Sequence, residues 1–128
     1  MPDDPTADQI RLTLPAAPEF VRIARLTCAG LATRTGMGYD DVEDLRIAVG
    51  EACSLLIGAG ERSGSITMTF TLLGGGLDVE AHGDLDGDPG DVDAELSDQI
   101  LEAVADEHEI DLARDRVRVA KRRSPIDA

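Results

Sequence analysis

The sequence predicts an α+β fold, a two-layer α/β sandwich in which helices cover one face of a mixed, mostly antiparallel sheet. The predicted elements follow in the order strand, two helices, two strands, helix, two strands. Two of the strands flank the triplet Gly74-Gly75-Gly76, which suits a tight hairpin. The chain has 128 residues, of which 42% are hydrophobic, and this is enough for one domain with its own core.

The first half of the chain predicts one short strand and two helices. Apolar residues alternate over residues 10–14, as in a half-buried strand. Apolar residues at three- and four-residue steps predict helices over residues 19–35 and 40–57. Glycines end both helices, and acidic residues crowd the first turns of the second helix, where they suit the helix dipole.

The second half predicts a hairpin, a third helix and two closing strands. The hairpin strands are expected over residues 65–73 and 77–81, followed by a loop over residues 83–90. The third helix is expected over residues 92–106 and the closing strands over residues 109–112 and 116–120. We therefore expect a flexible acidic N-terminus over residues 1–9, a folded domain over 10–121 and a flexible basic tail over 122–128.

Charge and composition restrict the partners. The formal net charge of −14 argues against direct binding to nucleic acid and favours basic protein partners. No Lys or Arg lies between Arg62 and Arg114, whereas Asp and Glu are frequent over residues 78–111. This acidic stretch is either a solvated face or one half of a bipolar surface that orients a partner.

Several features predict the compartment. No basic segment followed by an apolar run opens the sequence, and no apolar run is long enough to span a bilayer, so no membrane partner is expected. Cys28 and Cys53 lie in apolar helical patterns, which predicts buried free thiols. Buried free thiols fit a reducing compartment, and we expect a cytoplasmic protein.

One segment carries a family resemblance. Residues 43–53, Glu-Asp-Leu-Arg-Ile-Ala-Val-Gly-Glu-Ala-Cys, resemble a helix of the bacterial anti-sigma factor kinases, which switch between a sigma factor and an anti-anti-sigma protein. The order of elements is similar along nearly the whole chain, including a helix ending that contains residues 100–107 and a final strand that closes on Lys121. The resemblance implies the histidine kinase-like ATPase (Bergerat-type) fold, a role in stress response and a homodimer.

The resemblance also implies positions for a nucleotide site. The family helix carries a glutamate that orients the attacking group, then an asparagine four residues later that binds magnesium, and often a histidine four residues further on. These positions are Glu51, Leu55 and Ala59 here, and leucine cannot coordinate a cation.

The family aspartate that binds the adenine amino group falls at Gly83. Asp84 is one residue late and could replace that aspartate only if the strand ended in a bulge. The region expected to hold the glycine-rich ATP lid, residues 84–93, has no basic residue and several aspartates that would repel a polyphosphate.

These losses favour an anti-sigma factor that sequesters a sigma factor, is released by an anti-anti-sigma (STAS-domain) protein, and has a decayed ATP site with no cofactor. The alternative is an active ATP- and Mg-dependent serine/threonine kinase that phosphorylates the anti-anti-sigma protein, with Glu51 as the catalytic residue. Basic sigma surfaces would meet Asp98 and Glu102 on the third helix, and a second candidate patch for partner binding contains Arg22 and Arg25.

No metal site is expected. His82 and His108 lack metal-ligand spacing. Acidic residues in the loop 84–95 match positions one, three, five and twelve of a calcium-binding EF-hand, but Pro89 stands where the sharp turn needs glycine. An acidic solvated loop is expected, with calcium binding as the alternative.

Overall fold

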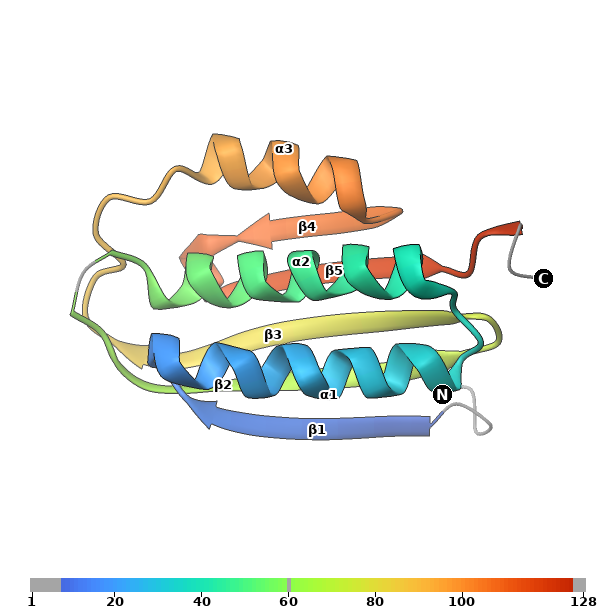
Figure 1. Cartoon of the computed structure of the whole chain (residues 1–128). Helices are drawn as coiled ribbons and strands as arrows, with labels where there is room; N and C mark the ends of the chain where they lie inside the picture. Colours follow the sequence, from blue (N-terminus) through green and yellow to red (C-terminus); the bar gives the residue numbers. More distant parts are fainter. Residues whose placement is uncertain (1–7, 60, 126–128) are drawn as a thin grey trace.

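The computed structural model describes residues 8–59 and 61–125. Within these ranges it contains five strands, three α-helices and two short 3₁₀ turns (Figure 1). The strands are β1 (Asp8–Pro15), β2 (Ser63–Leu73), β3 (Gly76–Asp86), β4 (Glu107–Asp111) and β5 (Arg116–Arg122). The helices are α1 (Val21–Arg34), α2 (Tyr39–Ile57) and α3 (Ala94–Val104), and the 3₁₀ turns are η1 (Pro18–Phe20) and η2 (Leu112–Arg114).

The strands form one sheet in the order β1-β2-β3-β5-β4, and each neighbouring pair is antiparallel. The three helices lie on one face of this sheet, with α2 between α1 and α3 (Figure 1). The predicted fold class is therefore confirmed. None of the described helices is both long and apolar enough to span a bilayer.

The core lies between the sheet and the helices. Its largest fully buried side chains include Leu45 and Leu56 from α2 and Met68 and Phe70 from β2. Cys28 and Cys53 are also buried as free thiols, as predicted. Burial raises the pKa of Cys28 to about 12 and that of Cys53 to about 11, so both thiols are neutral packing groups at physiological pH.

The prediction was wrong at the end of the hairpin. Residues 83–86 belong to β3 and not to a loop, because the pairing with β2 continues as far as Ser63 opposite Asp86. Polar residues such as Asp84 and Asp86 can continue a strand because their side chains face solvent while the backbone stays paired with β2. The third helix is also shorter than predicted, since the Asp93 side chain caps its start by accepting a hydrogen bond from the Leu96 N–H at 2.9 Å.

Strands also extend into both segments that were predicted as flexible. Strand β1 begins at Asp8, whereas residues 1–7 lie outside the described residues. Strand β5 continues to Arg122, and the Ser124 backbone N–H and hydroxyl both donate to Asp41 at 2.8 Å. Residues 126–128 lie outside the described part of the chain.

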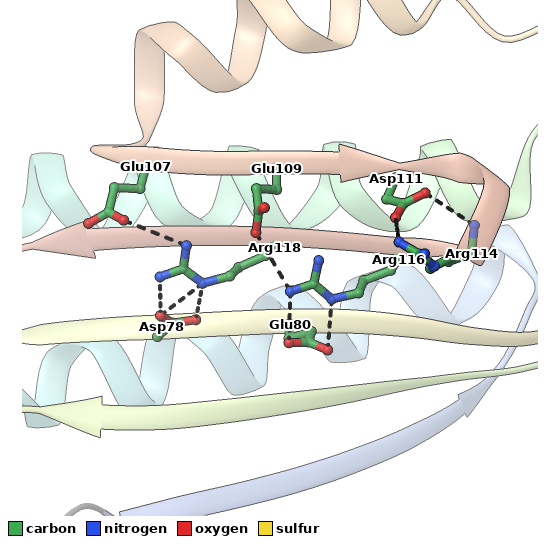
Figure 2. A network of polar contacts seen from close by, with 8 residues as sticks. All are labelled: Asp78, Glu80, Glu107, Glu109, Asp111, Arg114, Arg116 and Arg118. Atoms are coloured by element: carbon green, nitrogen blue, oxygen red, sulfur yellow. Dashed lines mark hydrogen bonds and ion pairs between the residues drawn. The ribbon is translucent and has the colours of Figure 1, made fainter. Parts of the chain in front are cut away.

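The helix-free face of the sheet carries a charged network (Figure 2). Arg118 of β5 lies 2.6 Å from Asp78 of β3 and 3.6 Å from Glu107 of β4. Arg116 bridges the same strands in the next row, at 3.0 Å from Glu80 and 3.6 Å from Glu109. These cross-strand pairs fix the register of the short edge strand β4.

A second ion pair lies at the end of the sheet where β3 finishes. The Arg62 side chain is only 5% exposed, and its guanidinium donates to both Asp115 carboxylate oxygens at 3.1 and 3.2 Å. It also donates to the carbonyl oxygens of Leu56 at 2.8 Å and Gly87 at 3.2 Å. One side chain therefore joins the end of α2, the segment after β3 and the turn before β5.

We expect Arg62→Ala to lower the free energy of unfolding by about 2 kcal/mol, because the partly buried Asp115 carboxylate and two backbone carbonyl groups would lose the buried guanidinium that donates to them. Urea denaturation would measure the loss. Arg114→Ala is the matched control, since Arg114 pairs with Asp111 but its side chain is 82% exposed. Its loss should stay below about 0.5 kcal/mol. Equal effects of the two substitutions would contradict the role assigned to Arg62.

Candidate functional site

The residues of the predicted nucleotide site lie on α2 and at its C-terminal end. Glu51 is half-buried on the outward side of the helix, next to Gly50 and Ser54. Two adjoining hollows flank it, with volumes of about 290 Å³ and about 230 Å³. The larger hollow lies between α1 and α2, and the smaller one lies between α2 and α3.

Glu51 has a partner that the sequence did not predict. The hydroxyl of Ser97 on α3 donates to a Glu51 carboxylate oxygen at 2.7 Å, and Ser97 is only 5% exposed. The two residues are separated by 46 positions, so no local pattern could have connected them. The bond ties α3 to α2 and engages one oxygen of the carboxylate to which the family resemblance assigns the orientation of the attacking group.

Leu55 and Ala59 stand where the family helix carries its magnesium-binding asparagine and often a histidine. Leu55 is 2% exposed and belongs to the hydrophobic core. Ala59 is exposed, and its backbone N–H donates to the carbonyl oxygen of Pro89 at 2.7 Å. Neither side chain offers an oxygen ligand for a metal ion.

Gly83 and Asp84 lie on opposite faces of β3. Gly83 is buried on the helix side, where an added side chain would overlap that of Leu85. Asp84 is exposed on the other face, opposite Ser65. The pairing between β2 and β3 shows no bulge from Ser63 to Leu73, so nothing turns the Asp84 side chain toward the helices.

The segment expected to hold an ATP lid packs against the end of α2. The Pro89 carbonyl approaches Gly58, which has a positive φ of 71° and no side chain to obstruct it. Arg62 holds the Gly87 carbonyl from the other side. The Arg62 guanidinium is thus buried in an ion pair with Asp115, and Arg62 lines neither of the two hollows beside Glu51.

The four residues predicted to bind a partner form two separate pairs. Arg22 and Arg25 are exposed on α1, and Asp98 and Glu102 are exposed on α3. The α3 pair shares His108 of β4, whose ring nitrogens lie 2.7 Å from Asp98 and 3.8 Å from Glu102. Helix α2 lies between the two pairs (Figure 1).

The acidic stretch does not form one face. Asp78, Glu80 and Glu107 neutralise arginines on the sheet surface, while Asp98 and Glu102 lie on α3 beside His108. The remaining carboxylates are concentrated over residues 84–95. Within residues 8–59 and 61–125, no three His, Cys, Asp or Glu side chains come together in an arrangement that could hold a metal ion.

Comparison with known proteins identifies the fold family. Residues 14–113 match the histidine kinase-like ATPase domain. The chain is 42% identical over 77 residues to the serine-protein kinase RsbW of Bacillus velezensis. This alignment covers 58% of this chain and 48% of that protein. RsbW of Bacillus subtilis is 41% identical over 76 residues, with 57% of this chain and 48% of the relative covered.

The chain thus spans about half the length of the curated relatives that it matches. The aligned part agrees with the relationship inferred from residues 43–53, and the family match covers the helices and most of the sheet. The chain therefore belongs to the histidine kinase-like ATPase domain family.

Proposed function

We propose that this protein is an anti-sigma regulatory factor that binds and sequesters a sigma factor without using ATP. Similarity to serine-protein kinases named RsbW supports a place in a partner-switching pathway, with an anti-anti-sigma STAS-domain protein as the second partner. The observation that carries the proposal is the Glu51–Ser97 hydrogen bond beside the buried Leu55. The site then retains a surface for binding, but Leu55 and Gly83 replace the metal ligand and the adenine-binding aspartate of the family.

Phosphoryl transfer depends on a metal ion and on positive groups that balance the charge of the transferred group. Leu55 supplies no metal ligand, and residues 84–93 supply no cation. The base-recognition position is Gly83, and Asp84 faces the other side of the sheet. Three separate contributions to nucleotide binding, namely the metal ligand, the cation of the lid and the adenine contact, are therefore missing from the same region.

The second candidate function is an active ATP-dependent kinase that phosphorylates the anti-anti-sigma protein. One observation favours it: Glu51 is present and remains partly exposed at the junction of the two hollows. A kinase would require Ser97 to release this carboxylate during turnover.

We further propose a cytoplasmic homodimer, as the family resemblance implies. Strand β1 supports an interface between two copies, because among the described residues it is an edge strand that pairs with β2 alone. The test is the mass of the purified protein in solution, measured by light scattering.

Mg-ATP should bind weakly or not at all. Isothermal titration calorimetry with Mg-ATP should give no saturable heat in the micromolar range, because the metal ligand and the adenine contact are missing. The serine-protein kinase RsbW of Bacillus subtilis is the positive control. A micromolar or tighter dissociation constant, about −8 kcal/mol or better, would contradict the decayed site and favour the kinase.

Glu51→Gln should leave both stability and partner binding unchanged, since glutamine still offers Ser97 an oxygen acceptor. Glu51→Ala removes that acceptor and should cost about 1 kcal/mol of stability. The same variants are then assayed for transfer of labelled phosphate from ATP to an anti-anti-sigma protein. A large loss of transfer in Glu51→Gln would show that this carboxylate is catalytic.

Sigma capture should be steered by charge. The partner is the sigma factor that the protein binds in a screen of purified sigma factors. The double variant Asp98→Lys/Glu102→Lys should lower the association rate constant more than it raises the dissociation rate constant. High salt should reduce the difference in association rate between variant and parent. His108→Gln is the control, because it breaks the contact with α3 but keeps both carboxylates. Association rates that match the parent at both salt concentrations would exclude this pair from steering and would leave Arg22 and Arg25 as the candidate patch.

A further inference from the structure

The segment at the end of β5 is bonded to several parts of the fold. Strand β5 ends beside the start of α2 (Figure 1). The Arg122 backbone N–H donates to the Asp106 carboxylate at 2.6 Å, and the Arg123 N–H donates to the Gly75 carbonyl oxygen at 2.6 Å. The Arg123 side chain also lies against Gly36, where an added Cβ would come within 2.9 Å of the guanidinium. The segment therefore contacts the residues after α3 and two turns of the chain.

The contact of this segment with α2 is centred on Asp41. This carboxylate lies in the first turn of the helix, and the residue is only 5% exposed. One of its oxygens accepts from the Ser124 N–H and the other accepts from the Ser124 hydroxyl, both at 2.8 Å. The Lys121 ammonium lies 3.8 Å from Asp41 and 3.3 Å from Asp44. Because a buried carboxylate requires such partners, Asp41 joins the start of α2 to residues 121–124, which we call the C-terminal latch.

Ser124 is the latch residue that a chemical modification would change most. Three basic residues precede it and Pro125 follows it, and both arginines of this run are exposed. Charge patterns of this kind are used by kinases to select their substrates. A phosphate on the hydroxyl would carry a charge of about −1.5 to −2 at pH 7. The donor that now faces Asp41 would thus become an anion beside a buried carboxylate.

We propose that Ser124 is a site of regulatory phosphorylation and that the phosphate opens the C-terminal latch. The donor of the phosphate is ATP bound to a serine kinase that selects basic segments. The Ser124 oxygen forms a bond to the γ-phosphorus, the bond from that phosphorus to ADP breaks, and the hydroxyl proton passes to a base of the kinase. This inference goes beyond the proposed function, because it involves neither a sigma factor nor the nucleotide site of this chain.

The latch has polar partners in both of its states. In the closed state the Ser124 hydroxyl donates to Asp41. In the open state the phosphate would pair with Arg122 and Arg123, since charge-assisted bonds from guanidinium groups to phosphate are strong. Repulsion between the phosphate and the Asp41 carboxylate opposes a return to the closed position. Phosphorylation therefore favours the open state.

Opening of the latch acts directly on α2. The residue before the helix is Gly38, which has no side chain to cap it. The first turn is held by the bond from the Val42 N–H to the Gly38 carbonyl oxygen at 3.0 Å and by the contacts of Asp41 with the latch. Phosphorylation at Ser124 would thus loosen the start of the helix that carries Glu51.

The test is amide hydrogen exchange, measured by NMR on the full chain with phosphoserine incorporated at position 124. The amides of the latch and of Val42 should exchange at least about tenfold faster than in the parent, which corresponds to about 1.4 kcal/mol. Ser124→Ala should have a smaller effect, because its backbone N–H still donates to Asp41. Phosphoserine at position 63 is the matched control, since Ser63 is exposed at the start of β2, the end of that strand remote from Gly75.

Removal of one carboxylate charge tests for repulsion. Asparagine keeps an oxygen acceptor but carries no charge, so in the Asp41→Asn background phosphoserine at position 124 should no longer accelerate exchange. Asp44→Asn is the control, because Asp44 contacts Lys121 and not Ser124, and this background should keep the acceleration. Circular dichroism confirms that each variant is folded.

The modification itself is tested with labelled ATP and a purified serine kinase that selects basic segments. The label should appear on Ser124 of the full chain, and Arg122→Ala/Arg123→Ala should lose it. The proposal is overturned if phosphoserine at position 124 leaves exchange as in the parent, or if phosphoserine at position 63 accelerates it equally. It is also overturned if the folded Asp41→Asn variant keeps the acceleration, or if no label reaches Ser124.

Discussion

The Arg62–Asp115 ion pair is the constraint on which the candidate site depends. Arg62 reaches the last turn of α2, the segment after β3 and the turn before β5, and these three parts are distant in sequence. Its side chain is 5% exposed, so its charge requires the Asp115 carboxylate beside it. The pair keeps the segment after β3 against the end of α2.

The region around Glu51 lies beside this end of α2. Helix α3 begins at Ala94, after the same segment, and brings Ser97 to the Glu51 carboxylate. The same packing leaves Leu96 exposed beside α2. The Ser97–Glu51 bond and the exposed Leu96 therefore both lie where α3 packs against α2.

The two faces of the molecule use charge differently. On the sheet face, Arg116 and Arg118 each lie between carboxylates of two strands, and the hydrogen bond to Asp78 raises the pKa of Arg118. The charges on that face pair with one another and stabilise the register of the strands. On the helix side, Arg25 of α1 and the acidic residues Asp93 and Glu95 at the start of α3 have no ion-pair partner among the described residues.

The sequence alone determined the order of the elements, the buried faces of α1 and α2, and the presence of Glu51, Leu55 and Gly83 at the positions of the family's nucleotide site. These features follow from local periodicity and from side-chain chemistry, and both can be read from residues that are close together in the sequence. Only the tertiary structure decided that β3 continues to Asp86, that the acidic stretch divides among three surfaces, and that Ser97 bonds Glu51. The Arg62–Asp115 and Ser97–Glu51 contacts join residues 53 and 46 positions apart. Such contacts depend on how sheet and helices pack, because no local pattern records which distant polar groups become neighbours.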